Sequence, residues 1–458
     1  MWYTFFMPKK KGPNIKRVKP DLPGGFRDFA PAEAIIKQRL LEKVRKTFEE
    51  FGFDPLETPA VEKTEILRGG EENSEQLIFT LNPAKRGGTE LKDLKKDQLS
   101  LRFDLTVPLA RFLAANPELP RPFRRYQIGR VWRGERQQAG RFREFTQADI
   151  DIVGSSSPEA DAEIIYVVYQ LFKSLGLNRF LIKVNNRKIL NCLPSWAGFP
   201  EKKLFDVLRV IDKKDKIGEQ TVKKELVRIV KKQAAERLFS FLKTEGDVKT
   251  KLFRVKEDFK NCAPAQEGIK ELVEIIRLFE AMKMDRENWE LDFSIVRGLG
   301  YYTGTIFETT LLAAPEFGSV ASGGRYDKLM MPFTGEKLPA VGISIGVDRL
   351  LASLEKMELL KKKPTKVKVL VLNLSPELRT DYYSFAGVLR GAGIPTEIYF
   401  GDDRTFQAQL AYAVKKEIPY VLIYGDSEKQ KNAVTIKNMS AREQKEIPKT
   451  NILQYFKK

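Results

Sequence analysis

The chain has 458 residues, of which 42% are apolar and 31% are charged, and its formal net charge is +19. At about 150 residues per domain, this length predicts two to four domains. The basic balance favours a polyanionic partner, nucleic acid first, over the alternative of a solvated charged surface. The sequence contains no histidine, which excludes histidine-dependent triads, histidine metal ligands and histidine acid–base catalysis.

The compartment is expected to be the cytoplasm. No apolar run of about 18 residues predicts a membrane span. The start of the chain, 1–7, is apolar but is followed at once by lysines without a cleavage site, so it does not resemble a secretory signal. Translation from Met7 is an alternative start. The two cysteines, Cys192 and Cys262, lie far apart and predict neither a disulfide framework nor a zinc site.

The first half of the chain predicts an arm, a helix and a hairpin. Residues 1–20 are basic and broken by prolines, which is typical of a flexible arm. From Pro31 to Gly52 the apolar residues recur at helical spacing. Residues 123–132 and 142–153 are strand-like, and the glycines between them predict a hairpin with a long loop. A second helix is expected over 158–175.

The second half predicts a helical insertion and a separate terminal domain. Lysines alternate with apolar residues at helical spacing within 189–288, and strand and glycine signals return over 289–333. A helix begins near Val347, and the charged run 361–364 indicates a linker. Residues 366–458 alternate strand and helix patterns, which predicts an α/β domain with a largely parallel sheet.

Two kinds of motif carry the chemistry. Arginines alternate with bulky residues on both strands of the hairpin at 131–151, and guanidinium groups grip phosphate oxygens in two-point fashion. A salt-bridged surface hairpin is the alternative interpretation. The glycine-rich strings are 297–304, 322–327 and 342–350, where glycine lets backbone approach a ligand closely. Each also fits an ordinary turn before a strand, and none is a P-loop, because no Gly-Lys-Ser/Thr follows.

Together these strings resemble the histidyl-tRNA synthetase family of class II. Pro23–Asp28, with the helix that follows and Pro59, is similar to motif 1, and Arg133–Asp151 is similar to motif 2. Gly346–Leu350 is similar to motif 3. The string that begins at Arg297 resembles the signature of the histidine enzyme, although Gly300 stands where the family often has aspartate. The resemblance extends from about residue 20 to the C-terminus.

The resemblance implies a fold of two main parts. It implies an α+β catalytic domain built on an antiparallel sheet, the class II synthetase fold, with a helical insertion. It also implies a C-terminal α/β anticodon-binding domain. The expected division is a basic arm at 1–20, a catalytic domain at 21–188 and 289–360, an insertion at 189–288, a linker at 361–365 and the anticodon-binding domain at 366–458.

The resemblance also implies the reaction. L-Histidine and ATP would give histidyl-adenylate and pyrophosphate, and histidine would then pass to the 3′ end of tRNA(His). The first step needs no enzymic base, because an α-carboxyl group is already ionised at neutral pH. Mg²⁺ would bridge the outer phosphates of ATP, and the resemblance assigns no protein ligand to it. A homodimer through the motif 1 helix and the absence of a membrane segment are expected as well.

Site residues follow from the same resemblance. Arg133 and Arg297 would be catalytic and grip the α-phosphate. The other ATP-binding residues would be Glu135 on the adenine, Arg141 on the phosphates and Arg349 on the γ-phosphate. The histidine-binding residues would be Asp104, Thr106 and Gln147 for the ammonium group, Asp151, Tyr301 and Tyr302 for the ring, and Arg297.

The absence of protein histidines leads to an expectation about pH. Any ionisation near pH 6.5 in histidine activation should belong to the substrate imidazole. We expect an arginine such as Arg102 or Arg143 to neutralise Asp151, so that the neutral ring is preferred.

Three alternatives remain. One is a catalytically silent paralogue such as a regulatory subunit of ATP phosphoribosyltransferase, which residues 366–458 and the three arginines Arg133, Arg297 and Arg349 disfavour. The others are a class II-like RNA-binding or polymerase-accessory protein and a class II synthetase for a different amino acid.

Overall fold

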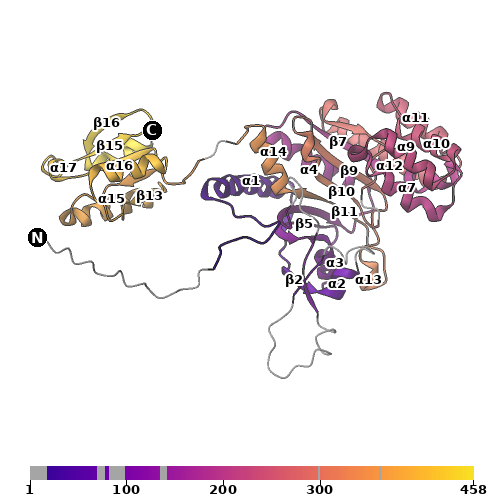
Figure 1. Ribbon diagram of the computed structural model, residues 1–458, viewed down its shortest axis with the longest axis horizontal. Coiled ribbons are helices and arrows are strands. Elements are labelled where there is room, and N and C mark those ends of the chain that lie inside the picture. The colour runs from indigo at the N-terminus through magenta and orange to yellow at the C-terminus, as the bar shows by residue number, and fades with distance from the viewer. Residues whose placement is uncertain are drawn as a thin grey trace, which may run out of the picture.

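The computed structural model of the chain describes residues 18–69, 78–81, 98–134, 142–297, 300–360 and 363–457 (Figure 1). Of the expected arm, only residues 18–20 fall in these ranges. Within them, no helix is long and apolar enough to cross a membrane.

An eight-stranded sheet forms the centre of the larger part of the molecule. Its inner strands are antiparallel, and only the edge pairs β1–β5 and β7–β8 are parallel. The predicted hairpin is confirmed as its longest pair of strands. In spatial order the strands are β1 (Asp54–Pro55), β5 (Phe123–Trp132), β6 (Glu144–Val153), β11 (Ala340–Gly346), β10 (Ser319–Arg325), β9 (Thr305–Leu311), β7 (Phe180–Asn186) and β8 (Trp289–Leu291).

Three helices cover one side of this sheet, and Figure 1 shows two of them, α1 and α14, above β5 and β11. They are α1 (Pro31–Glu50), α4 (Pro158–Ser174) and α14 (Val347–Lys356). Proline at the first turn starts α1 and α4, where its missing N–H is not needed. The apolar residues of α1 recur on one face and enter a single large hydrophobic core: Ile36, Leu40, Val44 and Phe48. Burial of this face anchors the helix to the sheet.

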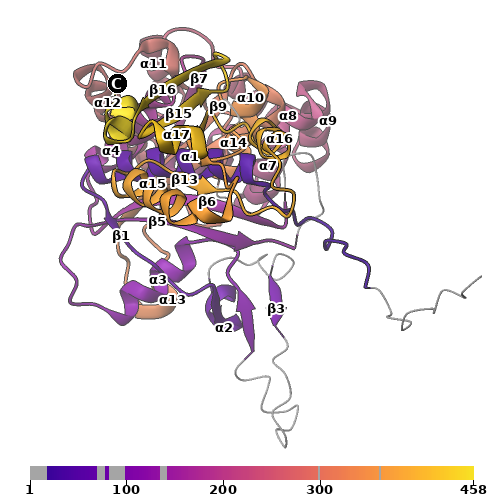
Figure 2. The ribbon, with the colours of Figure 1, turned by 90° about the vertical axis from the view of Figure 1, so that its left-hand side faces the viewer.

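Short elements lie on the opposite side of the sheet (Figure 2). They include a three-stranded antiparallel sheet in the order β2-β4-β3. These elements are β2 (Val61–Lys63), α2 (Thr64–Arg68), β3 (Phe79–Leu81), β4 (Leu99–Leu101), α3 (Thr106–Ala115) and α13 (Met331–Thr334).

The region expected to be a helical insertion contains helices and no strand within its described residues 189–288. They follow one another from α5, in which the expected boundary at residue 189 falls: α5 (Arg187–Asn191), α6 (Leu193–Ala197), α7 (Leu204–Ile211), α8 (Lys214–Ile217), α9 (Glu219–Ile229), α10 (Lys232–Leu242), α11 (Val248–Asp258) and α12 (Ala263–Ala281).

The expectation that the two cysteines would stay apart is wrong. Cys192, at the end of α5, forms a disulfide with Cys262, at the start of α12, and their Cα atoms are 6.4 Å apart. The helices between them fold back on themselves, so a sequence separation of 70 residues becomes a direct contact. The distance between two cysteines along the chain does not show whether the intervening helices bring them back into contact.

The C-terminal part has its own sheet and its own hydrophobic clusters. The prediction of a largely parallel sheet here is only partly correct. The last two strands form an antiparallel hairpin, which was not predicted. In spatial order the strands are β13 (Thr396–Ile398), β12 (Val369–Val371), β14 (Tyr420–Ile423), β15 (Ala433–Asn438) and β16 (Glu443–Pro448). The helices are α15 (Arg379–Gly391), α16 (Phe406–Lys415), α17 (Asp426–Gln430) and α18 (Ile452–Lys457).

Candidate active site

The face of the large sheet that carries the polar residues is set by strand register. Alternate residues of a strand share a face, and directly opposed residues lie side by side. One row across the sheet runs Gln127, Asp149, Ser344, Ser322, Glu308 and Lys183. The next row on the same face runs Arg125, Asp151, Gly342 and Gly324. Residues more than 150 positions apart in the chain therefore share one surface.

A cavity opens over these two rows. Its lining contains four of the expected histidine-binding residues: Thr106, Asp151, Tyr301 and Tyr302. The rest of the lining is Ser322, Tyr326, Gly342, Ile343 and Ser344. Glycine is required at position 342, because a Cβ there would lie 1.9 Å from Asp151 Oδ1. The missing side chain leaves room for the carboxylate in the floor of the cavity.

Asp151 is neutralised, but by a different arginine from those expected. Arg125 Nη2 lies 2.7 Å from Asp151 Oδ2, and both side chains are buried. The Tyr326 hydroxyl donates a short hydrogen bond to the other oxygen of Asp151. Burial raises the pKa of Asp151, while the charge of Arg125 and the hydrogen bond from Tyr326 oppose that rise.

The two arginines that were expected to pair with Asp151 lie elsewhere. Arg102 donates to backbone carbonyls of Thr58 and Arg130, and Arg143 donates to the carbonyl of Gly24. Arg143 precedes β6, about 26 Å of extended chain from Asp151, whereas Arg125 lies directly opposite Asp151 in the ladder. The register, which the sequence analysis did not use, identifies the partner.

Tyr326 was also missed, although it belongs to the string 322–327 that the sequence analysis selected. Its side chain is buried, and burial beside Asp151 raises its pKa well above 10.0. The group therefore remains a phenol that donates a hydrogen bond. The signal available in the sequence was a tyrosine directly after a glycine-containing strand.

The three residues that were expected to bind the ammonium group differ in their position relative to the cavity. Thr106 is the first residue of α3 and lines the cavity. Asp104 Oδ1 accepts a hydrogen bond of 3.2 Å from the amide of Val107 near the start of that helix. Gln147 lies outside the lining residues, but its amide nitrogen donates to Ser344, which is one of them.

Two buried carboxyl groups have pKa values raised toward the range in which the substrate imidazole was expected to titrate. Burial raises the pKa of Asp149 to about 7, against the charge of Arg125 and a hydrogen bond from Ser344. Burial likewise raises the pKa of Asp161 to about 6, against its ion pair with Arg325. A sequence without histidine can thus still contain groups that titrate in this range, because burial alone shifts a carboxyl group by several units.

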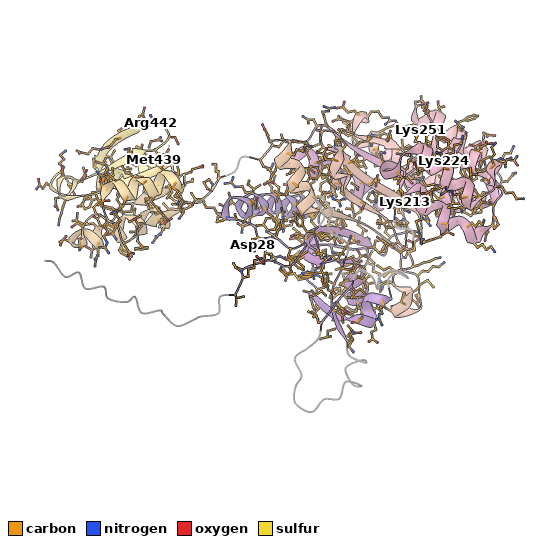
Figure 3. All side chains as sticks on the ribbon, in the orientation of Figure 1. Asp28, Lys213, Lys224, Lys251, Met439 and Arg442 are labelled. Carbon is orange, nitrogen blue, oxygen red and sulfur yellow. A yellow bond between two sulfur atoms is a disulfide. The ribbon has the colours of Figure 1, made fainter. Side chains whose placement is uncertain are left out.

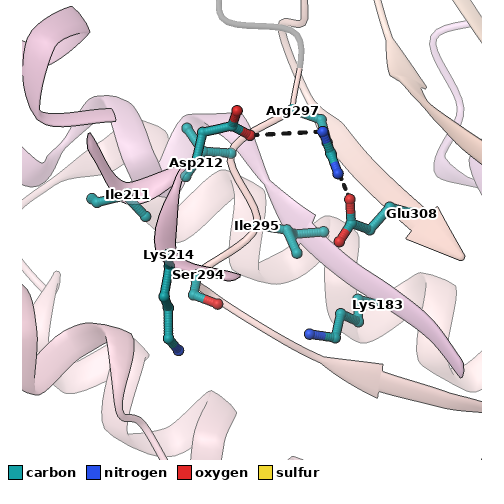
Figure 4. Close-up of a pocket in the computed structure, with 9 residues that line it drawn as sticks. Lys183, Ile211, Asp212, Lys214, Ser294, Ile295, Arg297 and Glu308 are labelled. Carbon is teal, nitrogen blue, oxygen red and sulfur yellow. Dashed lines mark hydrogen bonds and ion pairs between the residues drawn. The ribbon is translucent and has the colours of Figure 1, made fainter. Parts of the chain in front are cut away.

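Arg297 lies in a second cavity, between the large sheet and the helices of the insertion. It pairs with Glu308 of β9 and, at 3.9 Å, with Asp212 at the end of α7 (Figure 4). Lys183 and Lys214 line the same cavity. The structure does not bring Arg297 into the lining of the cavity that contains Asp151.

The other expected phosphate-binding residues are scattered along the sheet. Arg133 Nε donates to the carbonyl of Phe103 at 3.0 Å, and its guanidinium group lies 5.1 Å from the centre of the Phe145 ring. Arg349 donates to the carbonyl of Ser319 on β10. Glu135 and Arg141 lie outside the described residues. In the described ranges, no group of three or more Cys, Asp or Glu side chains is arranged to hold a metal ion.

Comparison with known proteins agrees with this architecture. The family model for histidyl-tRNA synthetase matches residues 25–350, and the model for the anticodon binding domain matches residues 368–458. The histidine–tRNA ligase of Wolinella succinogenes is 43% identical over 435 residues, 93% of this chain and 96% of that protein. The corresponding ligase of Clostridium tetani is 40% identical over 449 residues, 96% and 98% of the two chains.

A solved structure shows the same fold. The histidyl-tRNA synthetase of a Nostoc species superposes with a TM-score of 0.84 at 33% identity, and the match covers 96% of this chain and 99% of that chain. The expected class II architecture, with its helical insertion and its separate terminal domain, is thereby confirmed. On the strength of its motifs, its fold and these full-length relatives, the chain belongs to the histidyl-tRNA synthetase family of class II aminoacyl-tRNA synthetases.

Proposed function

We propose that this chain is a histidine–tRNA ligase, which activates L-histidine with ATP and transfers the histidyl group to the 3′ end of tRNA(His). The observation that carries the proposal is the floor of the first cavity, where Asp151 is held between Arg125 and Tyr326. Family membership supports the same conclusion.

The floor of this cavity suits a neutral imidazole ring. The ring offers one N–H donor and one bare nitrogen acceptor. Asp151 accepts from the N–H, and the hydroxyl group of Tyr302, in the same lining, donates to the bare nitrogen. A side chain without these two groups would leave buried polar atoms unpaired, so the pocket rejects it by a large factor.

Activation of histidine depends on positioning and charge. The histidine carboxylate attacks the α-phosphorus of ATP and pyrophosphate leaves, with no proton to remove. Arg133 and Arg297 stabilise the charge that develops at the α-phosphate, and Arg349 holds the γ-phosphate. Glu135 reads the adenine and Arg141 adds a phosphate contact. Mg²⁺ enters bound to the outer phosphates of ATP, as part of that substrate.

Transfer of histidine requires tRNA contacts on at least two parts of the chain. Residues 366–458 form the anticodon-binding domain, and the insertion at 189–288 contacts the body of the tRNA. Lys213, Lys224 and Lys251 lie on that insertion (Figure 3), where cationic side chains can neutralise phosphates. The chain forms a cytoplasmic homodimer through α1.

The test is ATP–pyrophosphate exchange by the full-length chain with each of the twenty amino acids in turn. Exchange with histidine alone supports the proposal. Exchange with a different amino acid identifies another class II synthetase. No exchange with any amino acid, by a folded chain that binds histidine, indicates a silent paralogue such as a regulatory subunit.

A further inference from the structure

Three polar side chains beside the first cavity form a continuous chain of hydrogen bonds. Gln147 Nε2 donates a short hydrogen bond to Ser344 Oγ, and Ser344 Oγ donates to Asp149 Oδ1 at 2.6 Å. Strand register brings them together, because Ser344 is directly opposite Asp149 in the β6–β11 ladder. Gln147 is 6% exposed and Asp149 is 2% exposed, so water does not compete freely for these bonds.

The donor in each bond is fixed by elementary chemistry. An ionised carboxylate can only accept hydrogen bonds, and a serine hydroxyl has a single proton. The proton of Ser344 therefore points to Asp149, which leaves only an oxygen lone pair for Gln147. The amide must turn its nitrogen toward that lone pair. Its carbonyl oxygen, Gln147 Oε1, is then left buried and has no hydrogen-bond partner in the described part of the chain.

A buried acceptor without a partner costs free energy unless a ligand supplies the donor. We propose that Asp149 and Ser344 are positioning residues that hold the Gln147 amide with its carbonyl oxygen toward the α-ammonium group of the amino-acid substrate. This inference rests on the proposed function and deepens it. Neither residue needs to touch the reacting atoms, because both act through the orientation of Gln147.

The same arrangement makes recognition of the ammonium group sensitive to pH. A protonated Asp149 can donate to Ser344 Oγ, whose own proton then turns to Gln147. The amide then rotates and presents its NH₂ group to the substrate ammonium, which it repels. In a protein without histidine, a buried aspartate thus acts as the switch near neutral pH.

The charges around Asp149 agree with this role. Burial raises its pKa to about 7. Arg125 on β5 opposes the rise, while Asp151 on β6 and Asp104 between β4 and α3 add to it. Arg102, which lies with Asp104 between β4 and α3, also interacts electrostatically with Asp149. β11 contributes the neutral Ser344 to this side of the carboxyl group.

The test compares two ligands that differ only in the ammonium group. L-Histidinol carries it, and 3-(imidazol-4-yl)propan-1-ol lacks it. Calorimetry on the full-length chain gives the ratio of their dissociation constants. At about pH 8.5, where Asp149 is ionised, we expect the wild-type chain to favour histidinol by roughly tenfold to a hundredfold, as for a hydrogen bond to a charged group. Ser344→Ala should lower this ratio several-fold, and the part that remains belongs to Asp104 and Thr106. If Ser344 only supported the fold, its loss would weaken the binding of both ligands equally and leave the ratio unchanged.

The second part of the test measures the same ratio of dissociation constants as a function of pH. Each constant is referred to the neutral ring, and that of histidinol also to its charged ammonium form, with the pKa values measured for the free ligands, so that ionisation of the ligands cancels. The wild-type ratio should fall as pH decreases through about 7, and the ratio in Asp149→Asn should not depend on pH. Ser174→Ala is the matched control, because Ser174 ends α4, donates to the carbonyl of Leu171 and is not among the residues that line the cavity. Its ratio should follow the wild type.

The outcomes separate this inference from the proposed function. Failure of the wild-type chain to bind histidinol, together with no histidine exchange, contradicts the proposed function. Normal exchange with a ratio that Ser344→Ala leaves intact, or with a pH dependence that survives in Asp149→Asn, overturns only the positioning role. If Ser344→Ala does not fold, Asp149→Asn decides the question alone.

Discussion

Arg125 and Asp151 face each other across the β5–β6 ladder, their charged atoms are 2.7 Å apart, and both side chains are buried. The pair places an anion in the floor of the proposed histidine pocket and compensates its charge at the same time. We therefore expect this pocket to bind the neutral ring, because an imidazolium ion would meet the compensating arginine without a free anion to balance it.

The first prediction concerns the pH profile of kcat/KM for histidine activation. We expect the rate to fall below about pH 6.5 as the substrate ring becomes protonated. A histidine analogue with a lower ring pKa should move this part of the profile to lower pH. A second ionisation near pH 7, from Asp149, should stay in place with either substrate. If the whole profile stays in place, the Asp151 pocket does not select the neutral ring.

The second prediction concerns Arg297. Arg297→Ala should reduce pyrophosphate exchange by about a hundredfold to a thousandfold, or about 3–4 kcal/mol, because it removes a donor to the developing charge at phosphorus. The fold should persist, since the side chain is 38% exposed. Asp212→Asn, which removes only the partner at 3.9 Å, is the control and should retain exchange within a few-fold. Near-normal exchange in Arg297→Ala would exclude the assigned phosphate contact.

The third prediction concerns stability. In the unfolded chain Asp149 ionises near its ordinary pKa of 3.8, whereas in the folded chain it keeps its proton up to about pH 7. Its contribution to the unfolding free energy is therefore complete below pH 4 and is lost as pH rises to 7, by up to about 1.4 kcal/mol per pH unit. Asp149→Asn should remove this part of the slope, as measured by urea unfolding at a series of pH values.

A control for that measurement is Asp403→Asn. Hydrogen bonds from Thr405 lower the pKa of Asp403, so this group titrates below the pH 4–7 window and its removal should leave the slope there unchanged. If Asp149→Asn and Asp403→Asn give the same slope as the wild type, the raised pKa of Asp149 is wrong.

The fourth prediction concerns the C-terminal domain. A chain that ends at residue 365 should keep histidine activation and lose tRNA charging, because residues 366–458 contain a complete sheet with its own apolar clusters. Among the described residues, a hydrogen bond from Lys366 to Gln38 of α1 links this domain to the rest. Loss of both activities in a truncated chain that still unfolds cooperatively would show that the two parts depend on each other.

The elements that the sequence predicted well are those whose pattern is local. Residues 123–132 match β5, and the helix expected from Pro31 matches α1, because long periodic segments define their own structure. The terminal antiparallel hairpin and the Cys192–Cys262 disulfide were missed, since both depend on how distant segments return. The same holds for the candidate site. The motifs pointed to the residues around Asp151, but the partner of Asp151, Arg125, is identified only by strand register.

Arg297 forms ion pairs with two parts of the molecule at once, with Glu308 of the sheet and with Asp212 of the insertion. A phosphate that engages its guanidinium group competes with both carboxylates for the same five N–H donors. Under the proposed function, engagement of the α-phosphate by Arg297 would loosen this connection between the catalytic sheet and the insertion. Because the α-phosphate stays in the histidyl-adenylate when pyrophosphate leaves, the connection would return only when AMP departs after transfer of histidine to the tRNA.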